Sequence, residues 1–150
     1  MNQLIYAIIL TVLPISELRG GIPYAISQGF SPLFVFLLLT FLNILVMFPI
    51  FFFLDYLHEH FLKIKFYSFV FNKYINRTRR KIEKHVGTKW ELVALYLLVA
   101  IPFPGTGCYT GTLAAWLFKI KRKKAYLAIS LGVVTAGVIV TLISLGIFST

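Results

Sequence analysis

Apolar residues along this chain fall into four long stretches, and two of them are uninterrupted. Residues 32–55 and 124–148 are each more than twenty residues long and mostly apolar. A helix rises about 1.5 Å per residue, so about 20 residues cross a hydrocarbon core of about 30 Å. The pattern therefore predicts two transmembrane helices.

The other two apolar stretches, residues 3–29 and 90–118, are broken near their centres. Proline and glycine concentrate at residues 14–23 and 102–107, where a continuous membrane helix tolerates them least. Each flank has about a dozen residues and would reach about 18 Å, roughly half a bilayer. We therefore predict two re-entrant hairpins, each made of two half-helices.

The distribution of positive charge supports the second hairpin. Fourteen of the fifteen Lys and Arg residues lie within residues 63–89 and 119–124. Basic loops stay in the cytoplasm. Residues 90–118 must then return to their starting side, and the uncharged chain ends lie outside. The ends of the first stretch are neutral, so its hairpin rests on the proline and glycine break.

These segments predict an all-α integral membrane protein made of two inverted repeats, each a re-entrant hairpin followed by a transmembrane helix. Residues 1–150 form one membrane domain. Its basic linker, residues 56–89, begins as an amphipathic interfacial helix and ends in a polar run, residues 77–85, expected in water. Small residues within 124–148 permit close helix contact, either inside the chain or with another subunit.

The amino-acid composition excludes some classes of protein. The chain is 59% apolar and 13% charged, whereas soluble domains are about 45–50% apolar and about 25% charged. A soluble enzyme and a disordered chain are excluded. The formal charge of +10 could suggest nucleic acid, but its confinement to two loops favours anionic lipid headgroups. We expect a multi-pass plasma-membrane protein that does not bind nucleic acid and that could form homo-oligomers.

Ionisable side chains are rare inside the predicted membrane core. Glu17 and Arg19 are the acid and the base found there. A charge at this depth costs at least about 2.5–3.5 kcal/mol, so it marks a functional site by default. We predict that Glu17 belongs to a functional site. The alternative is a Glu–Arg pair that only fixes the hairpin tip, and whether the two residues pair is open.

The glycine-rich tip of the second hairpin is the other candidate. Half-helices starting near Gly20 and Thr106 would aim unpaired N–H groups at the membrane centre, which suits an anion. Alternatively, the glycines only permit tight packing. The predicted substrate-binding residues are Glu17, Arg19, Gly20, Gly21, Pro102, Pro104, Gly105, Thr106, Gly107 and Thr110.

No catalytic, metal or cofactor site is predicted. His58, Glu59 and His60 beside Asp55 resemble a metal cluster, but they lie at the membrane interface without further ligands. No nucleophile or phosphate-loop motif is present, so we do not expect an enzyme. Asn43, inside the first span, is expected to be structural and to bond a hairpin loop.

Two motifs carry a resemblance. SELRGGIP at residues 16–23, together with PFPGTGCYTG at residues 102–111, resembles the small multidrug export protein family. That family is distantly similar to the DedA (SNARE-associated, VTT-domain) superfamily, whose members have two re-entrant hairpins. The resemblance implies a membrane transporter.

DedA relatives are implicated in polyprenyl-phosphate lipid recycling and proton-dependent membrane homeostasis, with acids in the first hairpin and arginines in the second. Glu17 matches an acidic position of the first hairpin, while the second hairpin here contains no arginine.

Three functions are therefore weighed. The first is a transporter or flippase for an anionic, phosphate-bearing lipid or small molecule, coupled to protons through Glu17. The second is an exporter of lipophilic cationic drugs. The third is a membrane scaffold that transports nothing, in which Glu17 and Arg19 could be neutralised without loss of function.

Overall fold

The computed structural model describes residues 2–149, and all of their regular structure is helical. The α-helices are α1 (Asn2–Val12), α2 (Glu17–Ser27), α3 (Pro32–Tyr56), α4 (His58–Phe61), α5 (Lys65–Ile82), α6 (Glu91–Ala100), α7 (Cys108–Leu117) and α8 (Arg122–Phe148), with a 3₁₀ turn, η1, at Glu83–His85.

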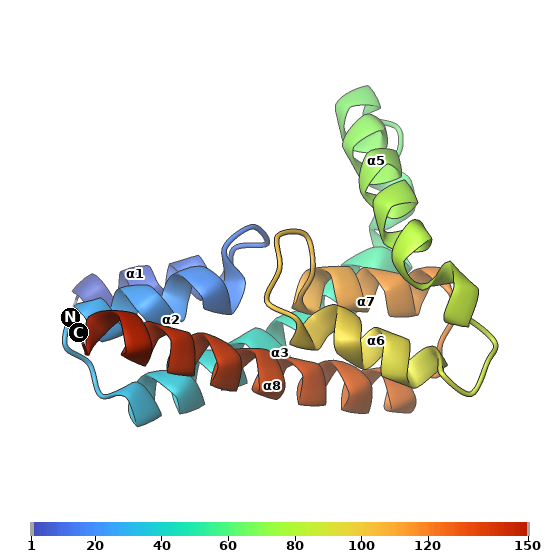
Figure 1. The fold of residues 1–150 in the computed structure, drawn as a ribbon. Coiled ribbons are helices and arrows are strands. Elements are labelled where there is room, and N and C mark those ends of the chain that lie inside the picture. Colours follow the sequence, from blue (N-terminus) through green and yellow to red (C-terminus); the bar gives the residue numbers. More distant parts are fainter. Residues whose placement is uncertain (1, 150) are drawn as a thin grey trace.

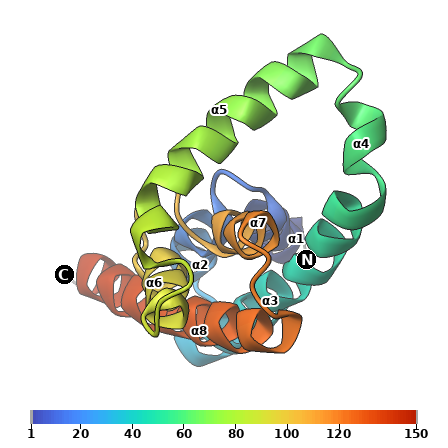
Figure 2. The ribbon, with the colours of Figure 1, turned by 90° about the vertical axis from the view of Figure 1, so that its right-hand side faces the viewer.

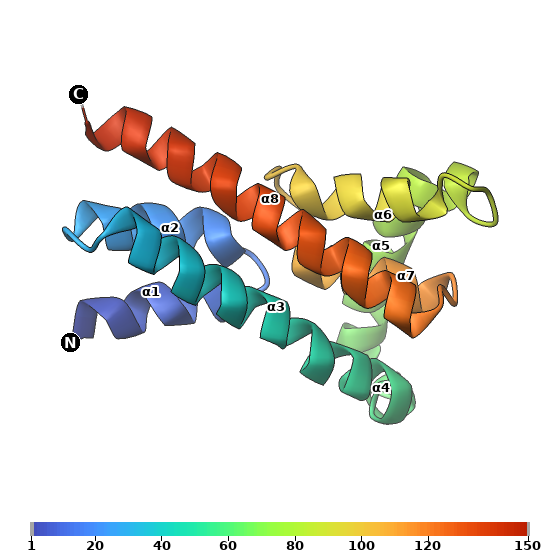
Figure 3. The same ribbon diagram turned by 90° about the horizontal axis from the view of Figure 1, so that it is seen from below.

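The two long helices form the frame of the molecule. α3 has 25 residues and α8 has 27, which corresponds to about 37 and about 40 Å. They run side by side in opposite directions (Figure 3). By length and composition both can cross a membrane. The two helices predicted at residues 32–55 and 124–148 are therefore present.

Each broken apolar stretch forms a pair of antiparallel short helices. We call α1 with α2 hairpin 1, and α6 with α7 hairpin 2; their tips are residues 13–16 and 101–107. The hairpins lie against opposite halves of the α3–α8 frame, and their tips meet near its middle (Figure 1). Both chain ends lie at the same end of the frame (Figure 1).

The break in hairpin 1 is shorter than predicted. Residues 14–23 were expected to interrupt the helix, but α2 already begins at Glu17 and includes Gly20, Gly21 and Pro23. Packing against α1 explains this: a Cβ on Gly21 would lie 1.9 Å from Thr11 Oγ1. Gly21 therefore serves close helix contact, which compensates for its low helix propensity.

Small residues in α8 also make contacts within the chain. A Cβ on Gly132 would lie 2.7 Å from Val99 Cβ in α6, and one on Gly137 would lie 2.6 Å from Thr40 Oγ1 in α3. At these two positions the predicted close approach joins helices of one chain.

The outer face of the frame is apolar. Large side chains such as Phe41, Leu37 and Leu142 are 58–64% exposed along α3 and α8. Apolar patches of this extent on a soluble monomer mark interaction or membrane surfaces. Together with the length of the two helices, this supports a membrane environment.

The linker forms an arch rather than a loose loop. α4 and α5 rise from the end of α3 and cross over α7 (Figure 2). α5 carries exposed apolar side chains, such as Phe66 and Phe69, which are 79% and 69% exposed. That this helix lies in the membrane interface stays a prediction. The polar run at residues 77–85 is helical as far as Ile82, most of its side chains are exposed, and its Lys81 bonds the tip of hairpin 2. Its position in water stays a prediction.

Candidate functional site

Glu17 lies where the two hairpin tips meet. It is the first residue of α2, has a positive φ of 47°, and is only 5% exposed. Its carboxylate accepts hydrogen bonds from the backbone N–H groups of Cys108 and Tyr109, both at 3.2 Å. The first N–H groups of a helix have no partner within it, and the positive end of its dipole favours an anion. A side chain of hairpin 1 therefore caps a helix of hairpin 2.

Gly107 makes this contact possible. Its φ is +123°, a region that residues with a side chain rarely adopt. A Cβ at this position would lie 2.0 Å from Glu17 Oε2. Glycine is thus required twice here, by the backbone conformation and by the approach of the carboxylate.

Hydroxyl groups close each tip. The Ser16 hydroxyl donates to the Leu10 carbonyl in hairpin 1. In hairpin 2, Thr106 Oγ1 accepts from the Phe103 N–H at 3.1 Å and lies 2.6 Å from the carbonyl oxygens of Ile101 and Phe103. Each irregular turn therefore satisfies part of its own backbone.

Two further bonds join the tips and the frame. Tyr109 donates its hydroxyl to the Val12 carbonyl at 2.5 Å, which links the two hairpins. The Asn43 amide, 1% exposed, donates to the Thr11 carbonyl at 3.1 Å. Asn43 thus bonds the last turn of α1, in line with its expected structural role.

Arg19 does not form an ion pair with Glu17. Its guanidinium donates instead to the Ile15 carbonyl at 3.1 Å. Within residues 2–149 the one side-chain ion pair joins Arg122, at the start of α8, and Asp55, near the end of α3. The pairing question left open by the sequence is answered here: Glu17 is held by backbone N–H groups, and Arg19 by a backbone carbonyl.

The junction of the tips is closed. A cavity of about 10 Å³ lies between them, which is room for about one water molecule and none for a phosphate group. Both tips contribute to its wall, together with α3, α6 and α8, through residues that include Glu17, Arg19, Asn43, Pro102, Thr106 and Gly107.

The remaining predicted site residues are placed less centrally. Gly20 packs on the chain's own turn, where a Cβ would lie 2.7 Å from Ser16 Cβ. Pro104 is exposed in the tip of hairpin 2. The Thr110 hydroxyl bonds the Tyr74 hydroxyl and lies 3.3 Å from the Gly105 carbonyl. The predicted roles of these residues in substrate binding stay predictions.

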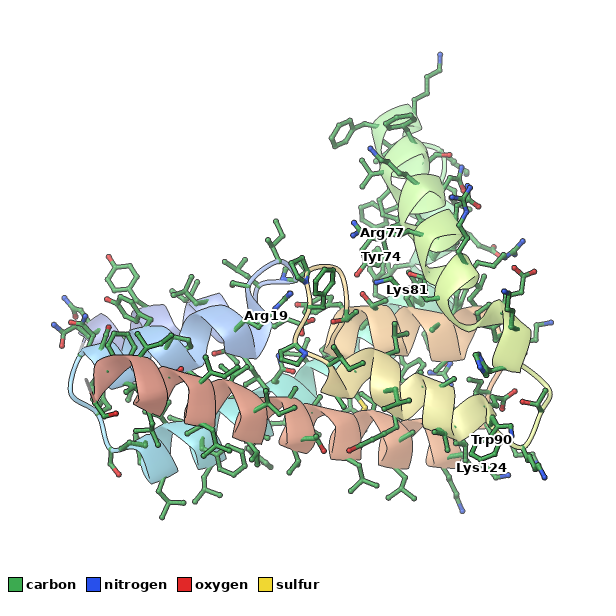
Figure 4. All side chains as sticks on the ribbon, in the orientation of Figure 1. Arg19, Tyr74, Arg77, Lys81, Trp90 and Lys124 are labelled. Carbon is green, nitrogen blue, oxygen red and sulfur yellow. The ribbon has the colours of Figure 1, made fainter. Side chains whose placement is uncertain are left out.

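Three residues of α5 were missed by the sequence reasoning. Tyr74, Arg77 and Lys81 follow one face of the helix and face the tip of hairpin 2, with Arg19 on the other side of that tip (Figure 4). Lys81 donates to the Gly105 carbonyl at 2.8 Å. Their spacing of three and four residues was a readable signal. The sequence did not show which hairpin this face of α5 would cover.

The histidines beside Asp55 form no metal cluster in the described part of the chain. His58 Nδ1 instead lies 3.0 Å from the Tyr67 hydroxyl, and its ring packs against Phe71 and Trp116. Burial lowers the pKa of His58. Its place among aromatic rings is therefore explained by packing.

Fold and site together define an all-helical protein with two membrane-length helices and two hairpin tips that meet at a buried carboxylate. The chain belongs to the family described as "Putative small multi-drug export protein", whose model matches residues 17–139. No curated protein and no solved structure matches the chain. The match includes Glu17 and the whole of hairpin 2. Membership indicates a membrane transporter.

Proposed function

We propose that this protein is a transporter or flippase for an anionic, phosphate-bearing lipid substrate, driven by protons through Glu17. The observation that carries the proposal is the Glu17 carboxylate on the N–H groups of Cys108 and Tyr109. This contact indicates that the start of α7 accommodates an anion, and that the anion is supplied by the other hairpin when no substrate is bound.

The proposed membrane arrangement is an inverted repeat. The short helices of both hairpins have 10 or 11 residues and would reach about 15–16 Å, half of the hydrocarbon core. The hairpins would enter from opposite faces, with the chain ends outside and the basic loops in the cytoplasm. The positions of the chain ends and of the two tips in Figure 1 support this arrangement.

Topology can be tested with single cysteines at Gln28, Asn76 and Lys121 in a Cys108→Ser background. Only position 28 should be labelled from outside. Labelling of position 121 but not of position 76 would make hairpin 2 a true span, and the inverted repeat would be wrong.

Proton coupling follows from competition for the same donors. When Glu17 is ionised, it occupies the N–H groups of α7, and the cavity between the tips has no room for a phosphate. Protonation removes the charge that the helix start favours, so the carboxyl group releases its hold. A substrate anion would then take these donors and Arg19, whose planar guanidinium suits phosphate. Proton and anion would thus pass the same point together.

The test is transport into proteoliposomes under an imposed pH gradient, with lipid phosphates and lipophilic drug cations compared side by side. Glu17→Gln should abolish proton-driven accumulation and retain some equilibrative exchange. Glu91→Gln is the matched control, because Glu91 also accepts a backbone N–H bond, from Gly87 at 2.8 Å, but lies at the start of α6. Accumulation by Glu17→Gln with an unchanged pH profile would eliminate the mechanism.

The family description favours a second candidate, the export of lipophilic cationic drugs. A buried carboxylate attracts such cations, whereas the positive charge of Arg19 beside the tip repels them. In the same assay, gradient-driven movement of drug cations and not of lipid phosphates would establish this alternative. A scaffold would transport neither and would tolerate Glu17→Gln without loss of function.

A further inference from the structure

We propose that α5 supplies the cations that bind the substrate's phosphate, and that the groove beside α5 holds the single hydrocarbon chain of a lipid phosphate monoester. This inference rests on the proposed function and assigns its headgroup and chain sites. Hairpin 2 contains no Lys or Arg between Trp90 and Phe118, so any cation at its tip must come from elsewhere in the fold.

Two cations of α5 lie against that tip. Lys81 Nζ donates to the Gly105 carbonyl, and a Cβ on Gly105 would lie 3.1 Å from the Arg77 guanidinium carbon. Partial burial lowers the pKa of Lys81, and the charge of Arg77 lowers it further. The two positive charges are therefore close together.

The positively charged side chains near this tip have unused hydrogen-bond donors. Among residues 2–149, Arg77 makes no hydrogen bond or ion pair, and Arg19 uses one nitrogen on the Ile15 carbonyl. The acid near them, Glu17, is already bonded to α7. Three positive side chains thus surround the tip of hairpin 2 with one carboxylate among them, and Figure 4 shows Arg77 and Lys81 on one side of it and Arg19 on the other.

An apolar groove leads to this cluster. It encloses about 650 Å³ between α3, α5, α7 and the tip of hairpin 1, within the range of about 300–1,000 Å³ typical of small-molecule sites. Ile50, Phe53, Val70, Phe71 and Leu113 line its length. Tyr74, one turn before Arg77, and Ile15, whose carbonyl holds Arg19, line it too. The groove therefore reaches the positive cluster.

Charge complementarity selects the occupant. A cationic amphiphile would place like charge against Arg77 and Lys81, whereas a phosphate would meet an unpaired guanidinium and an ammonium group. The length of the groove offers apolar wall and no further charged group. A phosphate carried on one long hydrocarbon chain fits both parts of the surface.

The headgroup site is tested by binding. The full chain in phosphatidylcholine nanodiscs is titrated with dodecyl phosphate, inorganic phosphate and dodecyltrimethylammonium. Dodecyl phosphate should bind tightest, and Arg77→Gln with Lys81→Gln should weaken it about tenfold or more. Arg79→Gln changes one charge at about 200° around the helix from Arg77 and should have little effect. Equal weakening by Arg77→Gln and Arg79→Gln would overturn the site, because only net charge would then matter.

The chain site is tested by filling the groove. Val70→Trp should weaken dodecyl phosphate binding several-fold and leave ethyl phosphate binding unchanged. Phe69→Trp is the control, since Phe69 is exposed outside the groove. Circular dichroism of each variant confirms that it is folded. Affinity that does not depend on chain length in the native protein, or dodecyl phosphate binding that Val70→Trp leaves unchanged, would overturn the groove assignment.

Transport separates this inference from the proposed function. If dodecyl phosphate binds in an Arg77-dependent way but no lipid phosphate is moved, the site stands and the function fails. If Arg77→Gln with Lys81→Gln transports lipid phosphate at the native rate, the function stands and the site fails.

Discussion

Hairpins 1 and 2 are both pairs of antiparallel short helices, but they bring different groups to the junction of their tips. Hairpin 1 turns within residues 13–16 and brings Glu17 and Arg19 to the junction; hairpin 2 turns through residues 101–107 and brings no charged side chain. Hairpin 2 contributes backbone groups instead. Gly105 and Gly107 have positive φ, and the first N–H groups of α7, which have no partner within the helix, donate to the Glu17 carboxylate.

This difference shows why the tips depend on each other. A buried carboxylate without donors is costly, and so are buried N–H groups without an acceptor. Each hairpin on its own would carry one of these defects. Together they compensate, so opening the junction must supply a substitute for each partner, such as a proton for Glu17 and an anion for α7.

The largest expected effect comes from Gly107→Ala, which breaks the contact between the hairpins. The new Cβ would meet Glu17 at 2.0 Å in a backbone region that alanine disfavours, so we expect a loss of stability of about 3 kcal/mol or more. Thermal unfolding in detergent measures it. Gly87→Ala has a positive φ but open space, and should cost only about 1–2 kcal/mol. Equal losses would show that backbone strain alone matters.

Next come the side chains that tie each hairpin to its long helix. Asn43 bonds the Thr11 carbonyl from α3, and Tyr96 bonds Thr135 in α8 at 2.8 Å. Asn43→Ala leaves a buried carbonyl unpaired and should cost about 2–3 kcal/mol. Tyr96→Phe removes a partly exposed bond and should cost about 1 kcal/mol. Unfolding midpoints of the two variants give the order, and the reverse order would contradict it.

Removal of the hydroxyl groups at the two tips should cause smaller losses of stability. Thr106→Val removes a hydroxyl in contact with three backbone atoms of two residues, Ile101 and Phe103, and should cost about 1–2 kcal/mol. Ser16→Ala removes one bond from a short turn, and should cost about 1 kcal/mol or less. Amide hydrogen exchange at the tips should rise more in Thr106→Val; faster exchange in Ser16→Ala would reverse the comparison.

The smallest effect is expected away from both tips. Asp55 pairs with Arg122 at 2.6 Å, but both side chains are more than a third exposed. Asp55→Asn should therefore change stability by less than about 1 kcal/mol, and the change should shrink at high salt. A larger, salt-independent loss would show that the frame depends on this end of the molecule and not mainly on the junction.

Much of the fold could be predicted from the sequence because the length and the interruption of an apolar stretch are local properties of the chain. The two long helices, the two interrupted stretches and the amphipathic linker each follow from residues next to one another. The extent of α2 did not, because the break predicted at residues 14–23 depended on glycine and proline alone. Contact with Thr11 of α1 makes Gly21 favourable in a helix, and that contact is tertiary.

The candidate site likewise has features that the sequence determined and features that only the tertiary structure decided. The sequence by itself determined that Glu17 and Arg19 lie in an apolar segment and that residues 102–107 interrupt another, because the cost of charge and of irregular backbone depends on local surroundings. Only the tertiary structure decided their partners. Glu17 meets Cys108 and Tyr109 about ninety positions away, and Lys81 reaches Gly105 from the linker. These pairings depend on how hairpin 1, hairpin 2 and α5 pack around the α3–α8 frame, and no local pattern encodes that geometry.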